Sequence, residues 1–133
     1  MPGRTVCIDA SAMIDLLLKT PRAAAVVQVL RGMDMVIAPD LINVEVLRTI
    51  RAQERSGAIS AEQAGEAIAD LVDSPLQRLP TTAMVREAWG LRGHVSPSDA
   101  LYALAARSIG VPLLTADVRL ARAHGLGVPV ITV

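Results

Sequence analysis

The sequence predicts an α/β fold in which helices cover both faces of a central parallel sheet of four or five strands, a three-layer α/β/α arrangement. Short runs rich in aliphatic residues alternate along the chain with longer helical patterns, and parallel strands need crossover connections of this kind. The length of 133 residues suits one domain with a substantial core. No linker, internal repeat or charge block interrupts the sequence. We therefore expect a single domain over residues 1–133.

The first part of the chain alternates between predicted strands and helices. The run RTVCID (4–9) predicts a strand, and the helical segments ASAMIDLLL (10–18) and PRAAAVVQVLRG (21–32) follow it. A second strand is predicted in MVIAP (35–39). The long segment LINVEVLRTIRAQERSG (41–57) has the spacing of an amphipathic helix and ends on glycine, a common stop signal.

The same alternation continues to the end of the sequence. Ser60 and Gln63 form a capping box that predicts the start of a helix over 60–75. A brief strand is predicted in LQRLP (76–80), and a helix in TTAMVREAWGLRG (81–93). The remaining predicted elements are the helix PSDALYALAARSIG (97–110), the strand in VPLLTAD (111–117), the short helix VRLARAHG (118–125) and the strand VPVITV (128–133).

Composition excludes some classes of protein. Thirteen basic residues balance thirteen acidic ones, so net charge gives no argument for a nucleic-acid partner. Hydrophobic residues make up 52% of the chain, but no apolar run approaches the about 20 residues of a membrane span, and the N-terminal residues lack a signal-peptide pattern. We expect a cytoplasmic protein with no membrane partner. The single cysteine, Cys7, is expected to be a buried core residue.

Four acidic residues occupy positions where parallel α/β folds collect functional groups. Asp9 and Asp117 each follow a predicted strand, Asp99 lies in the first turn of a predicted helix, and Glu45 lies a full turn inside another. The carboxyl ends of parallel strands meet at one edge of the sheet, where such folds bind ligands. The four carboxylates are therefore expected to point toward one edge.

Each of these residues also has a structural explanation when taken alone. Asp9 and Asp117 are good helix N-caps. Asp99 closes an S-x-x-D capping box with proline at the first helical position. Glu45 is harder to explain, because it shares a face with apolar residues, but a surface ion pair with Arg48 remains open.

Taken together, the four carboxylates favour a bound cation. Unpaired carboxylates at one edge would repel one another, and no lysine lies near them in the sequence to neutralise them. A set of oxygen ligands without cysteine or histidine suits Mg²⁺ or Mn²⁺ rather than zinc. Such an ion supports phosphodiester hydrolysis by activating water and neutralising charge on the phosphate, although phosphate monoesters and pyrophosphates would satisfy the same site.

The four acidic motifs resemble those of the PIN domain, and most nearly those of VapC toxins of toxin–antitoxin systems. The matching stretches are TVCIDASAMIDLL, APDLINVEVLRTI, SPSDALYALAAR and LLTADVRLAR, which cover nearly the whole chain in the order Asp, Glu, Asp, Asp. The resemblance implies an endoribonuclease dependent on Mg²⁺ or Mn²⁺ that cleaves cellular RNA (tRNA, rRNA or mRNA) and inhibits translation. It also implies a VapB-like antitoxin as partner, and a homodimer that forms a heterotetramer or a larger complex with that antitoxin.

The resemblance assigns roles to individual residues. Asp9, Glu45, Asp99 and Asp117 become the catalytic and metal-binding set, with Asp9 and Asp117 as the foremost direct ligands. Ser11 and Thr115 occupy hydroxyl positions beside the two aspartates, where they could hydrogen-bond a carboxylate or a metal-bound water. As residues at a helix start and a strand end, they could equally have no further role.

The sequence offers few aromatic residues for stacking on RNA bases. Trp89 lies in the pattern AMVREAW and is expected in the core or at an interface, so RNA would be held mainly through its phosphates. His94 and His124 lie outside the acidic motifs and receive no role. The candidate phosphate ligands are Arg48, Arg51, Arg86, Arg92 and Arg119.

Other functions remain open at this point. A groove for an antitoxin helix is expected among the helices near residues 11–55, because the high apolar content suggests covered surfaces. The strongest alternative is a degenerate PIN domain that only binds RNA or a protein. A receiver-type phosphoacceptor domain is disfavoured because Lys19 lies away from the strand ends, and a D-x-D phosphatase because Ser11 stands where a second aspartate is needed.

Overall fold

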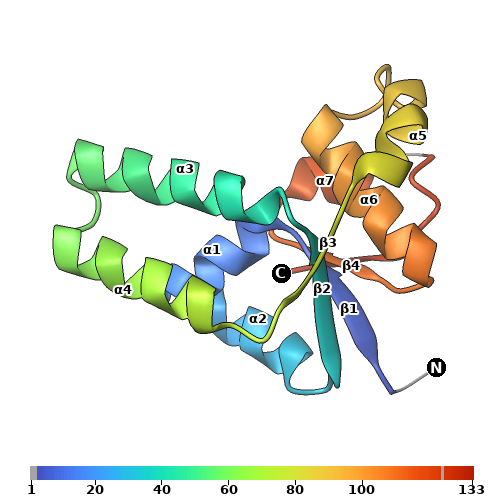
Figure 1. The fold of residues 1–133 in the computed structure, drawn as a ribbon. Coiled ribbons are helices and arrows are strands. Elements are labelled where there is room, and N and C mark those ends of the chain that lie inside the picture. Colours follow the sequence, from blue (N-terminus) through green and yellow to red (C-terminus); the bar gives the residue numbers. More distant parts are fainter. Residues whose placement is uncertain (1–2, 124) are drawn as a thin grey trace.

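A five-stranded parallel sheet lies at the centre of the computed structural model, which describes residues 3–123 and 125–133 (Figure 1). The strand order is β3-β2-β1-β4-β5. Helices lie on both sides of this sheet, which confirms the predicted three-layer α/β fold. The strands are β1 (Thr5–Ile8), β2 (Met35–Pro39), β3 (Gln77–Leu79), β4 (Leu113–Thr115) and β5 (Val130–Thr132).

The strand order places a topological switch point beside β1. The chain passes from β1 to β2 on one side, and later returns to place β4 on the other side of β1. Cys7 and Ile8 of β1 pair with Leu113 and Leu114 of β4, so the carboxyl ends of the two strands lie side by side. Ligand sites of open parallel sheets lie at such a point.

Helix ends follow local capping signals closely. The Ser60 side chain accepts a hydrogen bond from the Gln63 backbone N–H, and the Gln63 side chain accepts one from the Ser60 backbone N–H, which confirms the predicted capping box. Gly57 ends the long third helix in a left-handed conformation with φ 81°. The helices are α1 (Ala10–Leu18), α2 (Ala23–Leu30), α3 (Ile42–Ser56), α4 (Ala61–Asp73), α5 (Val85–Gly90), α6 (Pro97–Ile109) and α7 (Val118–Arg122).

Two predicted helices are shorter than expected. The helix predicted over 81–93 is a 3₁₀ turn at Thr82–Met84 followed by the six residues of α5. Gly90 and Gly93 both weaken helix formation at its end, and the second glycine falls outside the helix. The helix predicted over 118–125 ends at Arg122, because Ala123 already has an extended backbone.

Helices lie on both faces of the sheet, and two of them form a separate hairpin (Figure 1). Helices α5 and α6 cover one face of the sheet, and α1 and α2 lie on the other. Helices α3 and α4 pack against each other as a hairpin that also contacts α1 and extends past the sheet. In the described part of the chain, no helix has the length and apolar character needed to cross a membrane.

Cys7 lies in the middle of β1 and is fully buried. Burial raises the pKa of its thiol to about 12, so the sulfur stays protonated at neutral pH and is neither a nucleophile nor a metal ligand. The prediction of a buried core cysteine is confirmed.

Candidate functional site

Asp9 lies at the carboxyl end of β1 and begins α1. Its carboxylate accepts a hydrogen bond of 3.0 Å from the backbone N–H of Ala12, as an N-cap does. It also accepts a hydrogen bond of 2.7 Å from the Ser11 hydroxyl and a short hydrogen bond from the Thr115 hydroxyl. The side chain is 4% exposed. Asp9 is therefore the predicted cap, and it also carries two contacts that capping does not need.

Ser11 and Thr115 join the loops that follow β1 and β4. The Ser11 hydroxyl accepts a hydrogen bond of 2.9 Å from the backbone N–H of Ala116. The Thr115 hydroxyl accepts one of 2.9 Å from the backbone N–H of Asp117. Thr115 is fully buried. The two hydroxyls thus fix the Asp9 carboxylate from near and far along the sequence: Ser11 is two positions away and Thr115 is 106 positions away.

The buried Asp9 carboxylate is electrostatically costly. Burial raises its pKa, the three hydrogen bonds from Ser11, Thr115 and Ala12 lower it, and the charge of Asp99 raises it again. No arginine or lysine is paired with Asp9 among the described residues. A buried acid without a cationic partner is typical of a functional site.

Asp117 follows β4 and begins α7. Its carboxylate accepts a hydrogen bond of 2.9 Å from the backbone N–H of Arg119, which confirms Asp117 as an N-cap. The Arg119 guanidinium also pairs with it at 3.1 Å, and this hydrogen bond lowers the pKa of Asp117. The Asp117 side chain is 25% exposed and that of Arg119 is 89% exposed, so the pair lies at the surface.

Asp99 lies in the first turn of α6. The Ser96 hydroxyl caps α6 by accepting a hydrogen bond of 3.2 Å from the backbone N–H of Asp99. The Asp99 carboxylate is therefore not the cap of this helix. Burial raises the pKa of that carboxyl, the Ser96 hydroxyl lowers it, and the charges of Asp117 and Glu45 raise it. Asp99 therefore interacts electrostatically with the other three predicted site residues.

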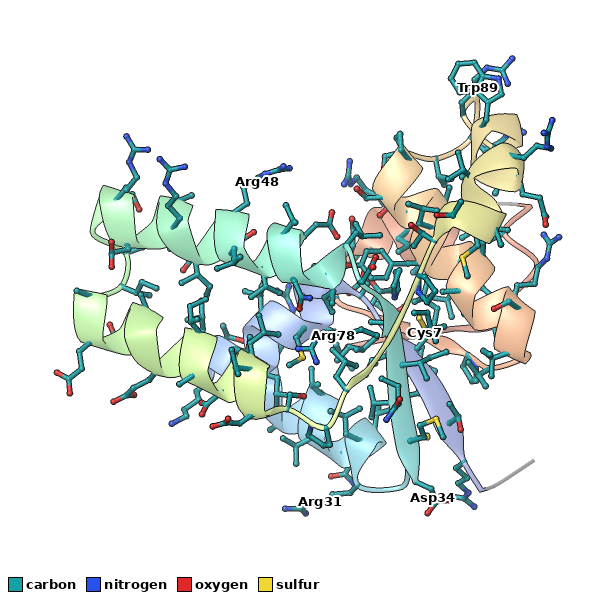
Figure 2. All side chains as sticks on the ribbon, viewed as in Figure 1. Cys7, Arg31, Asp34, Arg48, Arg78 and Trp89 are labelled. Atoms are coloured by element: carbon teal, nitrogen blue, oxygen red, sulfur yellow. The ribbon has the colours of Figure 1, made fainter. Side chains whose placement is uncertain are left out.

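Glu45 differs from its prediction in two ways. It lies in the first turn of α3, rather than a full turn inside, because the helix begins at Ile42. The ion pair with Arg48 is absent from the described residues, and Arg48 points away from the domain (Figure 2). Instead, the Tyr102 hydroxyl donates a hydrogen bond of 2.6 Å to Glu45 Oε1. The surface-pair explanation for Glu45 is therefore wrong.

Tyr102 is the residue of this site that sequence reasoning missed. It lies on α6, three positions after Asp99, and it is 2% exposed. Three positions apart on a helix places two side chains on neighbouring parts of one face. That spacing in SPSDALY was the available signal, but the partner on α3 is 57 positions away.

The four acidic motifs thus meet around the switch point of the sheet, and comparison with known proteins identifies the family. A family model described as the PIN domain matches residues 6–126. The chain belongs to the PIN domain family. Two curated relatives are from Mycobacterium tuberculosis: Ribonuclease VapC12 is 37% identical, with 90% of this chain and 92% of the relative covered. Ribonuclease VapC3 is 34% identical, with 95% of each covered.

A solved structure agrees with the fold of this PIN domain. VapBC2 from Rickettsia felis, crystallised with a DNA fragment from its promoter, includes a chain that matches with a TM-score of 0.67 at 14% identity. The match covers 96% of this chain and 98% of that one. At this identity the likeness concerns the fold alone.

The donor set of this PIN domain has the chemistry of a hard divalent cation site. We name the four residues Asp9, Glu45, Asp99 and Asp117 the acidic edge. Their ligand atoms are all oxygens, which suits Mg²⁺ or Mn²⁺. As the side chains stand, no three histidine, cysteine or acidic residues in the described ranges are close enough to bind one ion. Three of the four instead have side-chain partners within the chain: Asp9, Glu45 and Asp117.

Two further predictions concern Trp89 and the histidines. Trp89 on α5 is 67% exposed, and the Arg92 guanidinium lies 4.5 Å from its ring centre (Figure 2). The expectation of a core tryptophan is therefore wrong, while an interface position stays a prediction. His94 lines a small cavity of about 200 Å³ together with Asp99 and Arg119. His124 lies outside the described residues.

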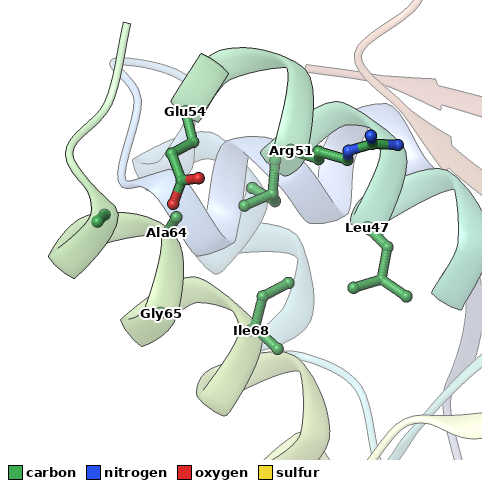
Figure 3. Close-up of a pocket in the computed structure, with 8 residues that line it drawn as sticks. Leu47, Arg51, Glu54, Ala64, Gly65 and Ile68 are labelled. Atoms are coloured by element: carbon green, nitrogen blue, oxygen red, sulfur yellow. The ribbon is translucent and has the colours of Figure 1, made fainter. Parts of the chain in front are cut away.

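An apolar groove lies between α3 and α4 (Figure 3). Its volume is about 380 Å³. We name it the α3–α4 groove. Leu47 on its wall is 50% exposed, which is high for a leucine. The groove therefore extends beyond the predicted region near residues 11–55, because α4 forms its second wall. Its lining residues are Leu47, Ile50, Arg51, Glu54, Ala61, Ala64, Gly65 and Ile68.

Proposed function

We propose that this PIN domain is a metal-dependent endoribonuclease, the toxin of a toxin–antitoxin module, which hydrolyses phosphodiester bonds in cellular RNA and inhibits translation. One observation carries the proposal: the carboxyl ends of β1 and β4 lie side by side at the switch point of the sheet, and the Ser11 and Thr115 hydroxyls join the loops there around the Asp9 carboxylate. The relatives that share 34% and 37% of the sequence are named ribonucleases. A protein that acts on tRNA, rRNA or mRNA would work in the cytoplasm.

The acidic edge would hold Mg²⁺ or Mn²⁺. When bound, such an ion supplies an activated water and neutralises charge that develops on the phosphate. The residues of the chain supply the fixed surroundings. Ser11 and Thr115 hold the Asp9 carboxylate in one orientation, and the buried position of Asp9 excludes water from one side of the site. Asp117 would be the ligand at the end of β4, where the exposed Arg119 side chain now pairs with it.

Arg119 is the best placed of the candidate phosphate ligands. Its guanidinium borders the cavity that Asp99 lines, and it is mostly exposed. With a cation at the acidic edge to neutralise Asp117, this exposed guanidinium would be free to bind an RNA phosphate. Arginine suits this task because its planar fork binds phosphate oxygens in pairs.

The partner we propose for the α3–α4 groove is a VapB-like antitoxin. The groove presents aliphatic walls from two helices with Arg51 and Glu54 among its lining residues, which suits the apolar face of an amphipathic helix. The relative from Rickettsia felis was crystallised as a VapBC complex. We expect a homodimer of the toxin that assembles with antitoxin into a heterotetramer or a larger complex, and no membrane partner.

RNA cleavage by purified protein tests the proposed function. Wild type should cut structured RNA with Mg²⁺ or Mn²⁺ and stop cutting in EDTA, whereas Asp9→Asn should bind RNA without cutting it. Asp70→Asn, which changes an exposed carboxylate on α4, is the matched control and should cut like wild type. Equal cleavage by wild type and Asp9→Asn would point to a contaminating nuclease.

The same experiment separates the alternative function. A degenerate PIN domain that only binds RNA would hold the RNA equally well in EDTA and in Mg²⁺, and neither preparation would cut. Sequencing the RNA ends that accumulate after induction of the protein in cells would then identify the substrate of an active enzyme.

A further inference from the structure

Tyr102 connects two parts of the acidic edge that no other hydrogen bond in the described chain joins. It lies on α6 one turn after Asp99, and its hydroxyl donates to Glu45 on α3 at 2.6 Å. The thiol of Cys7 in β1 contacts the backbone oxygen of Tyr102 at 3.8 Å, which links the same position to the central strand. Tyr102 is thus tied to the sheet at its backbone and to Glu45 at its side chain.

The kind of donor at Glu45 contrasts with the one at Asp117. Arg119 pairs with Asp117 through a full positive charge. This charge neutralises the negative charge of Asp117 that would attract a cation. The Tyr102 phenol is a neutral donor at physiological pH, because the ordinary pKa of a tyrosine is about 10. A neutral donor orients a carboxylate and leaves its negative charge in place.

A glutamate in the first turn of a helix has several side-chain rotamers, and a cation site gains from holding one of them. The bond from Tyr102 engages Oε1, and Oε2 remains for another ligand. Fixing the side chain beforehand removes the ordering cost that binding would otherwise include. Partners of metal-binding carboxylates act in this way in many sites.

We infer that Tyr102 is a positioning residue, which holds the Glu45 carboxylate at the acidic edge in the orientation needed for a divalent cation. The inference rests on the proposed function and adds a residue to it. It assigns a role to the single tyrosine of the chain. It does not make Tyr102 a ligand or a proton donor in the reaction.

Mn²⁺ affinity, measured by calorimetry, is the first test. Tyr102→Phe should weaken Mn²⁺ binding about 10- to 100-fold and lower kcat for RNA cleavage while KM for RNA stays unchanged. Thr20→Val is the matched control, since it removes a hydroxyl–carboxylate hydrogen bond of the same length, 2.6 Å to Asp15, away from the acidic edge. The control should bind Mn²⁺ like wild type.

A double-mutant cycle distinguishes positioning from general packing. If Tyr102 acts through Glu45, Tyr102→Phe should have no further effect on Mn²⁺ affinity when Glu45→Gln is already present. An equal loss in both backgrounds would overturn the inference. Wild type that binds Mn²⁺ with the same affinity as Tyr102→Phe would also overturn it and leave the proposed function standing, whereas wild type that neither binds Mn²⁺ nor cuts RNA overturns both.

A spectroscopic measurement does not depend on the folding of Tyr102→Phe. Because the chain has one tyrosine, the tyrosine doublet in the ultraviolet resonance Raman spectrum reports the hydrogen bond of Tyr102 alone. Glu45→Gln should change this doublet, and Mn²⁺ should shift it in wild type but not in Glu45→Gln. An identical doublet in wild type and Glu45→Gln would overturn the inference.

Discussion

The acidic edge and the α3–α4 groove are built by opposite means. At the acidic edge, charged groups are buried or half-buried, and Asp9, Glu45 and Asp117 are held by donors from their own loops or from distant elements. In the α3–α4 groove, aliphatic groups stay partly exposed between two helices that are close in sequence. The first region is costly in electrostatic free energy, and the second leaves apolar area uncovered.

Helix α3 takes part in both regions. Glu45 lies at its start and belongs to the acidic edge, and Leu47 lies two positions later and lines the α3–α4 groove. Two residues apart on a helix point to different sides. The difference teaches that one rigid helix can serve catalysis on one side and partner binding on another, so substitutions should separate the two functions.

The largest expected effect is on RNA cleavage, and it should leave the groove untouched. Asp99→Asn removes the charge that interacts with the other three acidic residues and should lower kcat about 100- to 1,000-fold. The affinity for the antitoxin, measured by calorimetry, should change far less than kcat for RNA cleavage. A comparable loss of antitoxin affinity would mean that the two regions are not independent.

The converse substitution is in the groove. A Cβ atom added at Gly65 would meet no atom within 4 Å, and Gly65 lines the α3–α4 groove, so Gly65→Trp should fill the groove and not disturb the core. Affinity for the antitoxin encoded by the neighbouring reading frame should fall about 100-fold. Gly65→Ala is the control and should retain binding. Cleavage of RNA by both variants should match wild type, and a loss of cleavage in Gly65→Trp would contradict the separation.

A smaller effect concerns the cost of the buried charge at Asp9. Its pKa in the folded protein is raised above 3.8, so the folded state favours the protonated form, and stability is lost as pH rises through that higher pKa. Asp9→Asn should therefore raise the free energy of unfolding at pH 7 by about 1 kcal/mol without metal. Near pH 3 the two proteins should have similar stability, and Mg²⁺ should stabilise only wild type. Urea unfolding at both pH values measures this.

The smallest expected effect is at Arg119. The Asp117 pair lies at the surface, so its removal should change cation affinity only modestly. Arg119→Ala should bind Mn²⁺ about two- to fivefold more tightly, because Asp117 no longer exchanges one partner for another. Its KM for RNA should rise, since a phosphate ligand is lost. Weaker Mn²⁺ binding in this variant would show that Arg119 supports the site rather than competes for it.

Local signals in the sequence were enough to predict most elements and three of the four carboxylate positions. Asp9 and Asp117 begin helices directly after strands, and the Ser60 box and the Gly57 stop depend on neighbours within a few residues. Such interactions involve residues that are close in sequence, so a local motif is enough to predict them. The order of the acidic motifs then indicated the family.

The remaining features depend on contacts between distant parts of the chain. The bond from Tyr102 to Glu45 joins two helices that only the folded sheet brings together, and the apparent pairing of Glu45 with Arg48 was a plausible local substitute. Trp89 lies in a six-residue helix, which is too short for its apolar pattern to indicate which side is buried. The extent of the α3–α4 groove likewise depends on where α4 packs against α3.

The hydroxyl of Thr115 that holds Asp9 also determines when activity can first arise during synthesis. The two residues are 106 positions apart, so the contact has a high contact order and forms only after β4 pairs with β1. A nascent chain that has not reached residue 115 has Asp9 but lacks the donor that orients it, and it also lacks Asp117. A growing toxin would thus remain harmless to the ribosome that makes it until its last strands are in place.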